Sequence, residues 1–110
     1  AMPTVGSDRK SFMLGGRRIT EEGGRCAAED GTLAGSALDM ATAVRNAVEM
    51  LGVDQATAAK MASSNPARAV GLEELTGAIR PGLRADLVLL DSDGNVVRSW
   101  ISGESAGASG

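Results

Sequence analysis

The spacing of apolar residues changes twice along the chain and divides it into three parts. The first part, residues 1–35, carries short apolar runs with weak alternation, such as FML at 12–14. The glycine pairs at 15–16 and 23–24 have the composition of two-residue hairpin turns. This pattern predicts two or three short strands joined by tight turns.

The second part, residues 36–72, has helical spacing. Its apolar side chains recur every three or four residues and form one stripe, which predicts an amphipathic helix that ends at Gly52. The stripe consists of Ala37, Met40 or Ala41, Val44, Val48 and Leu51.

Two further helices are expected before residue 72. Asp54 can cap the helix DQATAAKMASS, and Asn65 with Pro66 at the next position is typical of another helix start. That third helix would end at Gly71. The second helix would bury a narrow face of small and sulfur-containing side chains, namely Ala58, Met61 and Ala62.

The third part, residues 77–104, returns to strand spacing. The Pro-Gly pair at 81–82 has the composition of a type II turn. The nearly continuous apolar run at 85–91 predicts a buried strand, and a tight turn at 92–95 leads into the alternating return strand VVRSWI. The Gly, Ser and Ala residues of 105–110 predict a disordered tail.

Length, charge and composition narrow the class of protein. The chain of 110 residues is at most one domain, and one Phe, one Trp and no Tyr leave its core to aliphatic side chains and Met. The net charge is −3 and no basic face with stacking aromatics is present, so we expect no nucleic-acid partner. No apolar run approaches the roughly 20 residues of a membrane span, and no signal peptide is visible. We therefore expect a soluble cytoplasmic protein without membrane contact.

The chain contains no histidine, and this restricts its chemistry. Zinc and iron sites, as well as nucleophile–histidine systems, rely on imidazole. Cys26 is the single cysteine, so it cannot form an internal disulfide, and it has no base partner. We expect Cys26 to be unreactive, and we predict neither a catalytic residue nor a metal ligand in this chain.

The stretch GTLAGSALD at residues 31–39 permits two interpretations. Ser36 and Asp39 fit a capping box at a helix start. Gly31 and Gly35 would also let a ligand approach main-chain N–H groups ahead of the helix, which suits phosphate or sugar oxygens. The spacing alone leaves both a plain capped loop and a ligand-holding loop open.

Four segments, taken in order, resemble a known family. They are DGTLAGSALDMATAVRNAVEMLGV, AAKMASSNPARAVGL, GAIRPGLRADLVLLD and VVRSWISGE. Together they closely resemble the C-terminal third of N-acetylglucosamine-6-phosphate deacetylases, which are amidohydrolase-superfamily enzymes of amino-sugar catabolism. The similarity runs from Ala1 to about Glu104. NPAR and G-x-I-x-x-G-x-x-A-D-L alone indicate only the superfamily, whereas GTLAGS followed by VRNAVE points to the deacetylase.

The resemblance implies an α/β fold, namely the C-terminal part of a (β/α)8 metal-dependent hydrolase barrel plus the last strands of its small β-sandwich domain. Residues 1–76 would be the end of the barrel, with a loop and hairpin at 1–35 and helices at 36–72. Residues 77–104 would be strands of the composite sandwich domain, followed by the tail at 105–110.

The function implied is that of part of an N-acetylglucosamine-6-phosphate deacetylase, in which a divalent metal (zinc or iron) assists amide hydrolysis to glucosamine 6-phosphate and acetate. The catalytic aspartate of the family belongs to a run Thr-Asp-Ala-Met-Pro and would lie one residue before Ala1, with the metal ligands further upstream. We therefore expect this fragment to be inactive alone and to bind no metal. Leu33, Ala34 and Gly35 match the family's substrate-contacting loop, which acts largely through its backbone. The implied partner is N-acetylglucosamine 6-phosphate, and the parent is expected to be a homo-oligomer.

The remaining polar, aromatic and sulfur-containing residues are expected to be structural. Carboxylates without a companion ligand or base should cap helices and turns or be solvated, and the basic residues should lie on the surface. Trp100 should be a packing residue, and the methionines should fill the core. The residues concerned are Asp8, Asp30, Asp39, Arg9, Arg17, Arg18, Met40, Met50 and Met61. Two alternatives stay open: a C-terminal piece of another amidohydrolase of the cyclic amidase type, or a non-catalytic anion-binding module.

Overall fold

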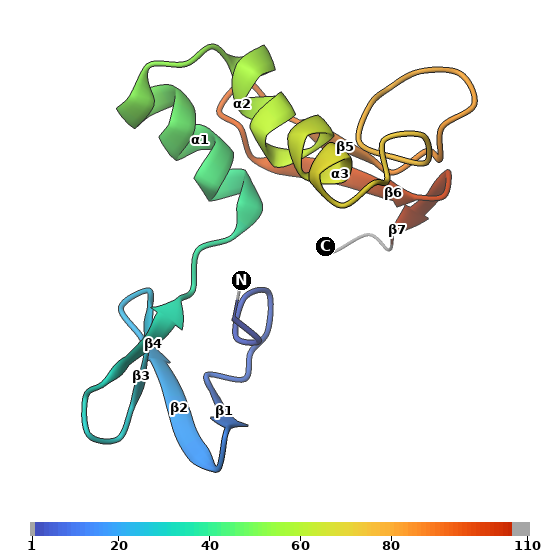
Figure 1. Ribbon diagram of the computed structural model, residues 1–110. Helices are drawn as coiled ribbons and strands as arrows, with labels where there is room; N and C mark the ends of the chain where they lie inside the picture. Colours follow the sequence, from blue (N-terminus) through green and yellow to red (C-terminus); the bar gives the residue numbers. More distant parts are fainter. Residues whose placement is uncertain (1, 107–110) are drawn as a thin grey trace. The chain divides into compact units, whose positions relative to one another are not determined.

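The computed structural model describes residues 2–106, which combine strands and helices in an α/β arrangement. The chain divides into two compact units, residues 1–43 and residues 44–110. Figure 1 shows the strands and helices along the chain. Each unit is described by itself below.

The first unit is built around a four-stranded antiparallel sheet in the order β1-β2-β3-β4. Its strands are β1 (Ser11–Leu14), β2 (Arg17–Glu22), β3 (Arg25–Ala28) and β4 (Leu33–Ser36). Both predicted glycine turns are confirmed, since all four glycines at 15–16 and 23–24 have positive φ angles between 58° and 81°. Positive φ at both central residues is what a two-residue hairpin turn needs. The sheet has four strands, where two or three were expected.

A small core lies on one face of this sheet. Ile19, Cys26 and Ala28 are buried, with exposed fractions of 3%, 0% and 8%. Four partly buried side chains pack against them, namely those of Met2, Phe12, Ala34 and Ala37. Cys26 is the largest side chain that is fully buried among the described residues, so this core is thin.

The structure corrects the expected start of the first helix. Ser36 ends β4 and its hydroxyl accepts a hydrogen bond from the amide of Leu38 at 3.1 Å. The helix α1 spans Met40–Leu51, and the Asp39 carboxylate accepts from the amide of Thr42 at 2.8 Å. The capping box of Ser36 with Asp39 is therefore wrong, because residues 33–36 pair with β3 and the chain reaches helical geometry only after Asp39.

Two shorter helices follow, α2 (Gln55–Ala62) and α3 (Ser64–Ala69). The predicted cap is confirmed, since the Asp54 carboxylate accepts from the amide of Thr57 at 2.6 Å. The expected cap at Asn65 is wrong. The cap is Ser63 and α3 begins at Ser64, two residues earlier than expected, because the carbonyl of Ser63 already accepts the first helical bond, from the amide of Ala67 at 3.0 Å.

The second sheet contains β5 (Leu87–Leu90), β6 (Val96–Ile101) and β7 (Glu104–Ala106), all antiparallel and in that order. The type II turn is confirmed, with a φ of 92° at Gly82 and a hydrogen bond from the amide of Leu83 to the carbonyl of Arg80 at 3.3 Å. The tight turn between β5 and β6 is confirmed as well, with the amide of Gly94 donating to the carbonyl of Asp91.

The tail expected at 105–110 needs correction at its start. Ser105 pairs with Trp100, and Ala106 pairs with Ser99, so both residues belong to β7. The backbone of a short, small-residue segment forms a strand here because β6 offers it an unpaired edge. Residues 107–110 lie outside the described part of the chain.

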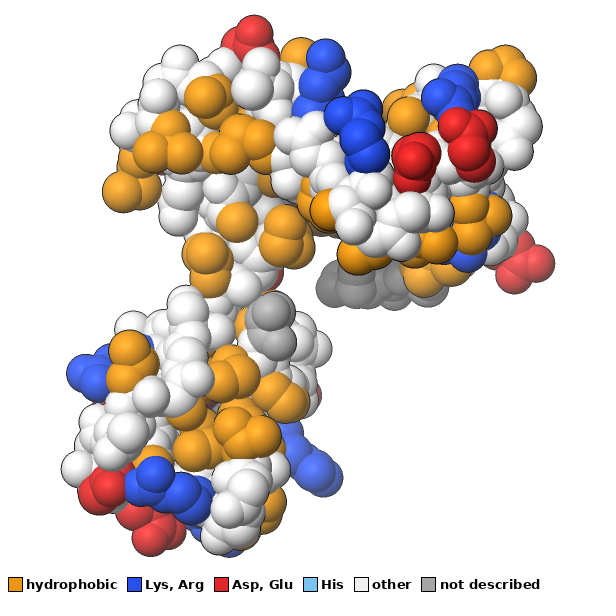
Figure 2. All heavy atoms as spheres, in the orientation of Figure 1, with side chains coloured by type: hydrophobic (Ala, Val, Ile, Leu, Met, Phe, Trp, Pro, Cys, Tyr) orange, Lys and Arg blue, Asp and Glu red, His pale blue; other side chains and the backbone are white. Residues whose placement is uncertain are grey.

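The second unit leaves most of its apolar side chains exposed. The helix α1 has no buried residue among those described, and within α2 and α3 only Ala58 and Ala67 are buried. The expected core role of the methionines is wrong, since Met40, Met50 and Met61 are 60%, 77% and 44% exposed. Figure 2 shows hydrophobic side chains on the surface over α1. The strand β5 is likewise only partly covered, because Val88 and Leu89 are exposed.

Candidate functional site

The residues predicted to contact substrate, Leu33, Ala34 and Gly35, lie together on β4. Gly35 stands opposite Cys26 of β3 and Leu33 stands opposite Ala27, which leaves Ala34 as an extra residue between the two pairs. This is a β-bulge, a feature that locally disrupts the ladder and is frequent beside functional sites. β4 is also an edge strand of the sheet, so one side of its backbone is not used for pairing within the sheet.

The bulge directs neighbouring side chains differently. Leu33 is 63% exposed, whereas Ala34 packs against the core formed by Ile19, Cys26 and Ala28. Neither side chain carries a polar group. The hydrogen-bonding groups that this stretch can offer to a ligand are therefore its backbone N–H and C=O groups, as the sequence resemblance implies.

Gly35 lies in close contact with the side chain of Met2. A Cβ built on Gly35 would stand 2.6 Å from Cε and 3.3 Å from Cγ of Met2. Gly35 is not among the glycines with a positive φ, in contrast to Gly31 with a φ of 84°. Space, rather than backbone conformation, is what glycine provides at position 35. The sequence alone gave no signal of this contact.

The three carboxylates considered as substitute bases are not brought together at a site. The Asp30 carboxylate accepts from the amide of Thr32 at 2.9 Å and from the guanidinium of Arg17 at 2.6 Å. The Thr32 hydrogen bonds, together with the charge of Arg17, lower the pKa of Asp30 below its ordinary value of 3.8. Asp39 caps α1, and Asp8 is an exposed residue ahead of β1. The structure gives Asp30 and Asp39 the turn and cap positions that were predicted for them.

The Arg17–Asp30 ion pair was not anticipated from the sequence. It joins the start of β2 to the β3–β4 turn at 2.6 Å, with both side chains more than half exposed. Arg9 and Arg18 are exposed. An exposed pair of this kind contributes little to stability because water and salt screen it. Its paired charges also reduce the attraction of Arg17 for a phosphate.

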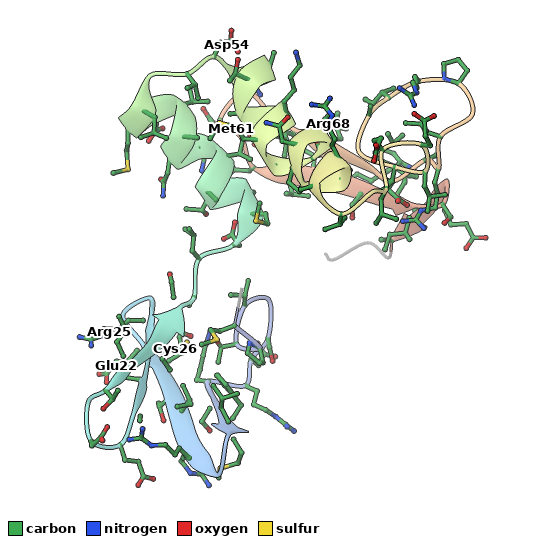
Figure 3. All side chains as sticks on the ribbon, in the orientation of Figure 1. Glu22, Arg25, Cys26, Asp54, Met61 and Arg68 are labelled. Carbon is green, nitrogen blue, oxygen red and sulfur yellow. The ribbon has the colours of Figure 1, made fainter. Side chains whose placement is uncertain are left out.

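A shallow hollow of about 410 Å³ lies on β2, β3 and the turn that follows. Its lining includes Glu22 and Arg25, which face each other across the β2–β3 pair and are labelled in Figure 3, and also Glu29. Two carboxylates against one guanidinium make the hollow acidic on balance, so its electrostatics disfavour an anion such as a phosphate.

Cys26 is the fully buried residue opposite Gly35 and is labelled in Figure 3. Its Sγ lies 3.6 Å from Oγ1 of Thr4, which is itself only 2% exposed. A thiol in this environment is shielded from reagents. The geometry agrees with the prediction of an unreactive cysteine and offers no base beside it.

The residues from 2 to 106 do not fit a catalytic metal. They contain no group of three or more Cys, Asp and Glu side chains arranged to hold an ion, and the chain has no histidine. Hydrolytic zinc sites require at least three protein ligands. We therefore derive no catalytic step through a metal held by these residues. Across the same stretch, none of the helices combines the length and apolarity needed to cross a bilayer.

The described residues form a supported edge strand without catalytic groups beside it. They offer a bulged edge strand with accessible backbone groups, held on a small apolar core, and this described part of the chain lacks a paired nucleophile and base.

The chain belongs to the amidohydrolase family, which matches it over residues 7–106. Members of this family are generally metal-dependent hydrolases. The resemblance inferred from the sequence motifs is thereby confirmed at the level of the family.

Particular relatives extend this assignment. The N-acetylgalactosamine-6-phosphate deacetylase of Escherichia coli O157:H7 is 42% identical over 106 residues, which cover 96% of this chain and 28% of that protein. A crystal structure of N-acetylglucosamine-6-phosphate deacetylase from Pasteurella multocida matches with a TM-score of 0.83 at 33% identity, over 92% of this chain and 27% of the other.

A further solved structure was determined with a ligand. It is a D267A mutant of N-acetyl-D-glucosamine-6-phosphate deacetylase from Mycobacterium smegmatis in complex with N-acetyl-D-glucosamine-6-phosphate. It matches with a TM-score of 0.78 at 34% identity, over 96% of this chain and 28% of that one. The present chain thus spans about a quarter of the length of these three proteins.

Proposed function

We propose that this chain is a segment of an N-acetylglucosamine-6-phosphate deacetylase, the enzyme that hydrolyses the acetamide of that sugar phosphate to glucosamine 6-phosphate and acetate. The observation that carries the proposal is the similarity of nearly the whole chain, in sequence and in backbone, to deacetylases of amino-sugar phosphates. An amidohydrolase that shared only the superfamily motifs NPAR and G-x-I-x-x-G-x-x-A-D-L would not be expected to resemble the deacetylases in the β4 region too.

Within that enzyme the chain would form the end of the (β/α)8 barrel, residues 1–76, and the last strands of the small sandwich domain, residues 77–104. The exposed apolar side chains of α1 support this proposal, because a helix at the outside of a barrel packs its stripe against strands. Met40 and Leu51, two members of the stripe at 60% and 68% exposure, are candidates for such a contact.

The proposed role of Leu33, Ala34 and Gly35 is to present backbone groups to the sugar phosphate. The bulge at Ala34 and the edge position of β4 support it, since both leave main-chain groups available. Catalysis itself, including water activation by the divalent metal (zinc or iron) and proton transfer by an aspartate, would rest on residues outside this chain.

A second candidate differs only in the sugar. The 42% identical relative is named as a deacetylase of N-acetylgalactosamine 6-phosphate, whereas solved structures at 33%, 34% and 41% identity carry the gluco name. The two substrates are epimers at C4, so one hydrogen bond to that hydroxyl can separate them by a large factor.

The test is an acetate-release assay with both sugar phosphates, with zinc or iron added. The full-length protein encoded by the reading frame that contains these residues should release acetate from at least one substrate, and the ratio of kcat/KM values identifies the sugar. The 110-residue chain should release none under the same conditions. Turnover by the chain alone would overturn the proposal that the catalytic residues lie outside it. If the full-length protein turned over neither substrate, the proposed function itself would be overturned.

A further inference from the structure

The chain ahead of β1 crosses the face of the sheet as a short strap. We define the strap as residues 2–5, which form a turn closed by a hydrogen bond from the amide of Val5 to the carbonyl of Met2 at 3.0 Å. Met2 packs against the core and touches Gly35. Thr4 is buried at 2% exposure with its hydroxyl 3.6 Å from the sulfur of Cys26.

The strap contacts two paired residues on neighbouring strands: Met2 contacts Gly35 of β4, and Thr4 contacts Cys26 of β3. Cys26 and Gly35 are directly opposite each other in the β3–β4 register. Residues opposite each other in an antiparallel pair project to the same face of the sheet. Met2 and Thr4, two positions apart in the strap, therefore cover one cross-strand pair, and the absence of a side chain at Gly35 makes room for Met2.

The strap contacts the sheet beside an interruption in its backbone hydrogen bonding. The pair next to Gly35 in β4 is interrupted by the bulge at Ala34, and β4 has a neighbour on one side only. Backbone pairing alone leaves such a segment free to shift. The Met2 side chain, packed on Gly35 and against the core, supplies a contact that the ladder lacks.

From this geometry we infer that Met2 is a positioning residue for the backbone of Leu33, Ala34 and Gly35. It holds the bulged end of β4 in place through the space that Gly35 leaves open, and it does not touch the ligand itself. The inference rests on the proposed function where activity is concerned, because these three residues are substrate-binding only within that proposal.

An exchange of side chains tests the contact. Gly35→Val adds a branched side chain that strands tolerate but that occupies the volume of Met2, so it displaces the strap. Met2→Ala removes the obstruction. The double variant has the same number of side-chain heavy atoms as the wild-type pair, and such volume-conserving changes are tolerated best.

Thiol labelling reports the strap without any assay of activity. Cys26 is the single cysteine of the chain and is fully buried beneath the strap, so its reaction rate with Ellman's reagent measures local opening. We expect Gly35→Val to raise the labelling rate by about tenfold and Met2→Ala with Gly35→Val to return it to within about twofold of the wild type. Ala27→Val is the matched control. Ala27 is next to Cys26 in β3, but its side chain lies on the opposite face of the sheet, away from the strap. This variant should leave the labelling rate of Cys26 unchanged.

Kinetics of the full-length enzyme test the positioning role. Gly35→Val should raise KM for the sugar phosphate by about tenfold with a smaller change in kcat, and the double variant should recover most of that loss. A uniformly destabilised enzyme would lose active protein and would not show this split or the recovery.

The outcomes separate the two proposals. Labelling of the wild type as fast as a free thiol, an unchanged rate in Gly35→Val, or a double variant that labels as fast as Gly35→Val would each overturn the role of Met2. Labelling as expected, with KM unaffected in an active deacetylase, would also overturn it. If labelling is as expected but the protein deacetylates neither sugar phosphate, the packing role of Met2 stands and the proposed function is overturned.

Discussion

Ala67 of α3 and Gly77 lie so close that a Cβ on Gly77 would stand 2.6 Å from the Cβ of Ala67. The same Cβ would stand 3.2 Å from the carbonyl oxygen of Ser63, and Gly77 has a φ of 97°. Ala67 is buried, and the hydroxyl of Ser64 donates to the carbonyl of Gly77 at 2.7 Å. The contact therefore joins α3 to the segment that leads towards β5.

Gly77→Ala should destabilise the second unit by about 1–3 kcal/mol, because the change adds backbone strain to a collision with atoms that cannot move freely. Urea unfolding of the chain, followed by the emission of Trp100 as its one tryptophan, measures the loss. Gly71→Ala is the matched control, since Gly71 has a φ of 75° but open space around it, and it should cost less. Equal losses in the two variants would contradict the steric part of the argument.

Removal of the Asp54 cap should shorten and weaken α2. The carboxylate satisfies the amide of Thr57 at 2.6 Å, and Asp54→Ala leaves that amide to water. We expect a lower thermal midpoint and reduced helical circular dichroism, whereas Asp54→Ser should retain most of both. A midpoint unchanged in Asp54→Ala would show that α2 is held by packing alone.

Acid should weaken the second unit through Asp86. Its carboxylate accepts from the amide of Ser102 at 3.0 Å, from Nε of Arg84 at 2.5 Å and from the hydroxyl of Thr76 at 3.0 Å. The hydrogen bond from Ser102, followed by that from Arg84, lowers the pKa of Asp86 below its ordinary value of 3.8.

The folded state therefore favours the ionised carboxylate. The stabilisation is fully present above pH 3.8, the ordinary value, and is lost as the pH falls further through the lower folded-state pKa. Unfolding midpoints measured between about pH 6 and pH 2 should fall in that acidic range. Asp86→Asn should be less stable at neutral pH and show a weaker acid dependence, and an identical acid profile in both proteins would contradict this assignment.

Arg45 should stabilise the contact between α1 and the β5–β6 turn. Its guanidinium donates to the carbonyl of Gly94 at 3.0 Å and to Oδ1 of Asn95 at 3.2 Å. Arg45→Met keeps the apolar stem and removes both bonds, so we expect a loss of about 1 kcal/mol in urea unfolding. Arg68→Met, at an exposed arginine of α3, is the control and should change stability by less.

The candidate site was only partly predictable. The resemblance of GTLAGS identified Leu33, Ala34 and Gly35, but it gave no indication that Ala34 forms a bulge or that Met2 fills the space beside Gly35. Those features depend on β3 and on the strap, which lie at other places in the sequence. Whether the three residues bind the sugar phosphate stays a prediction.

The sequence by itself determined the features whose physics is local. The glycine pairs at 15–16 and 23–24 set their hairpins because positive φ costs glycine little, and Asp54 capped α2 because its partner amide is three residues away. The tertiary structure decided which segments pair and which side chains are covered. Residues 33–36 became a strand instead of a loop and helix start, and Ser105 joined β7, because each paired with the free edge of the strand that precedes it in the chain. Burial also depends on the tertiary structure. The apolar stripe of α1 shows which side chains could be buried, but only neighbouring elements determine whether they are buried.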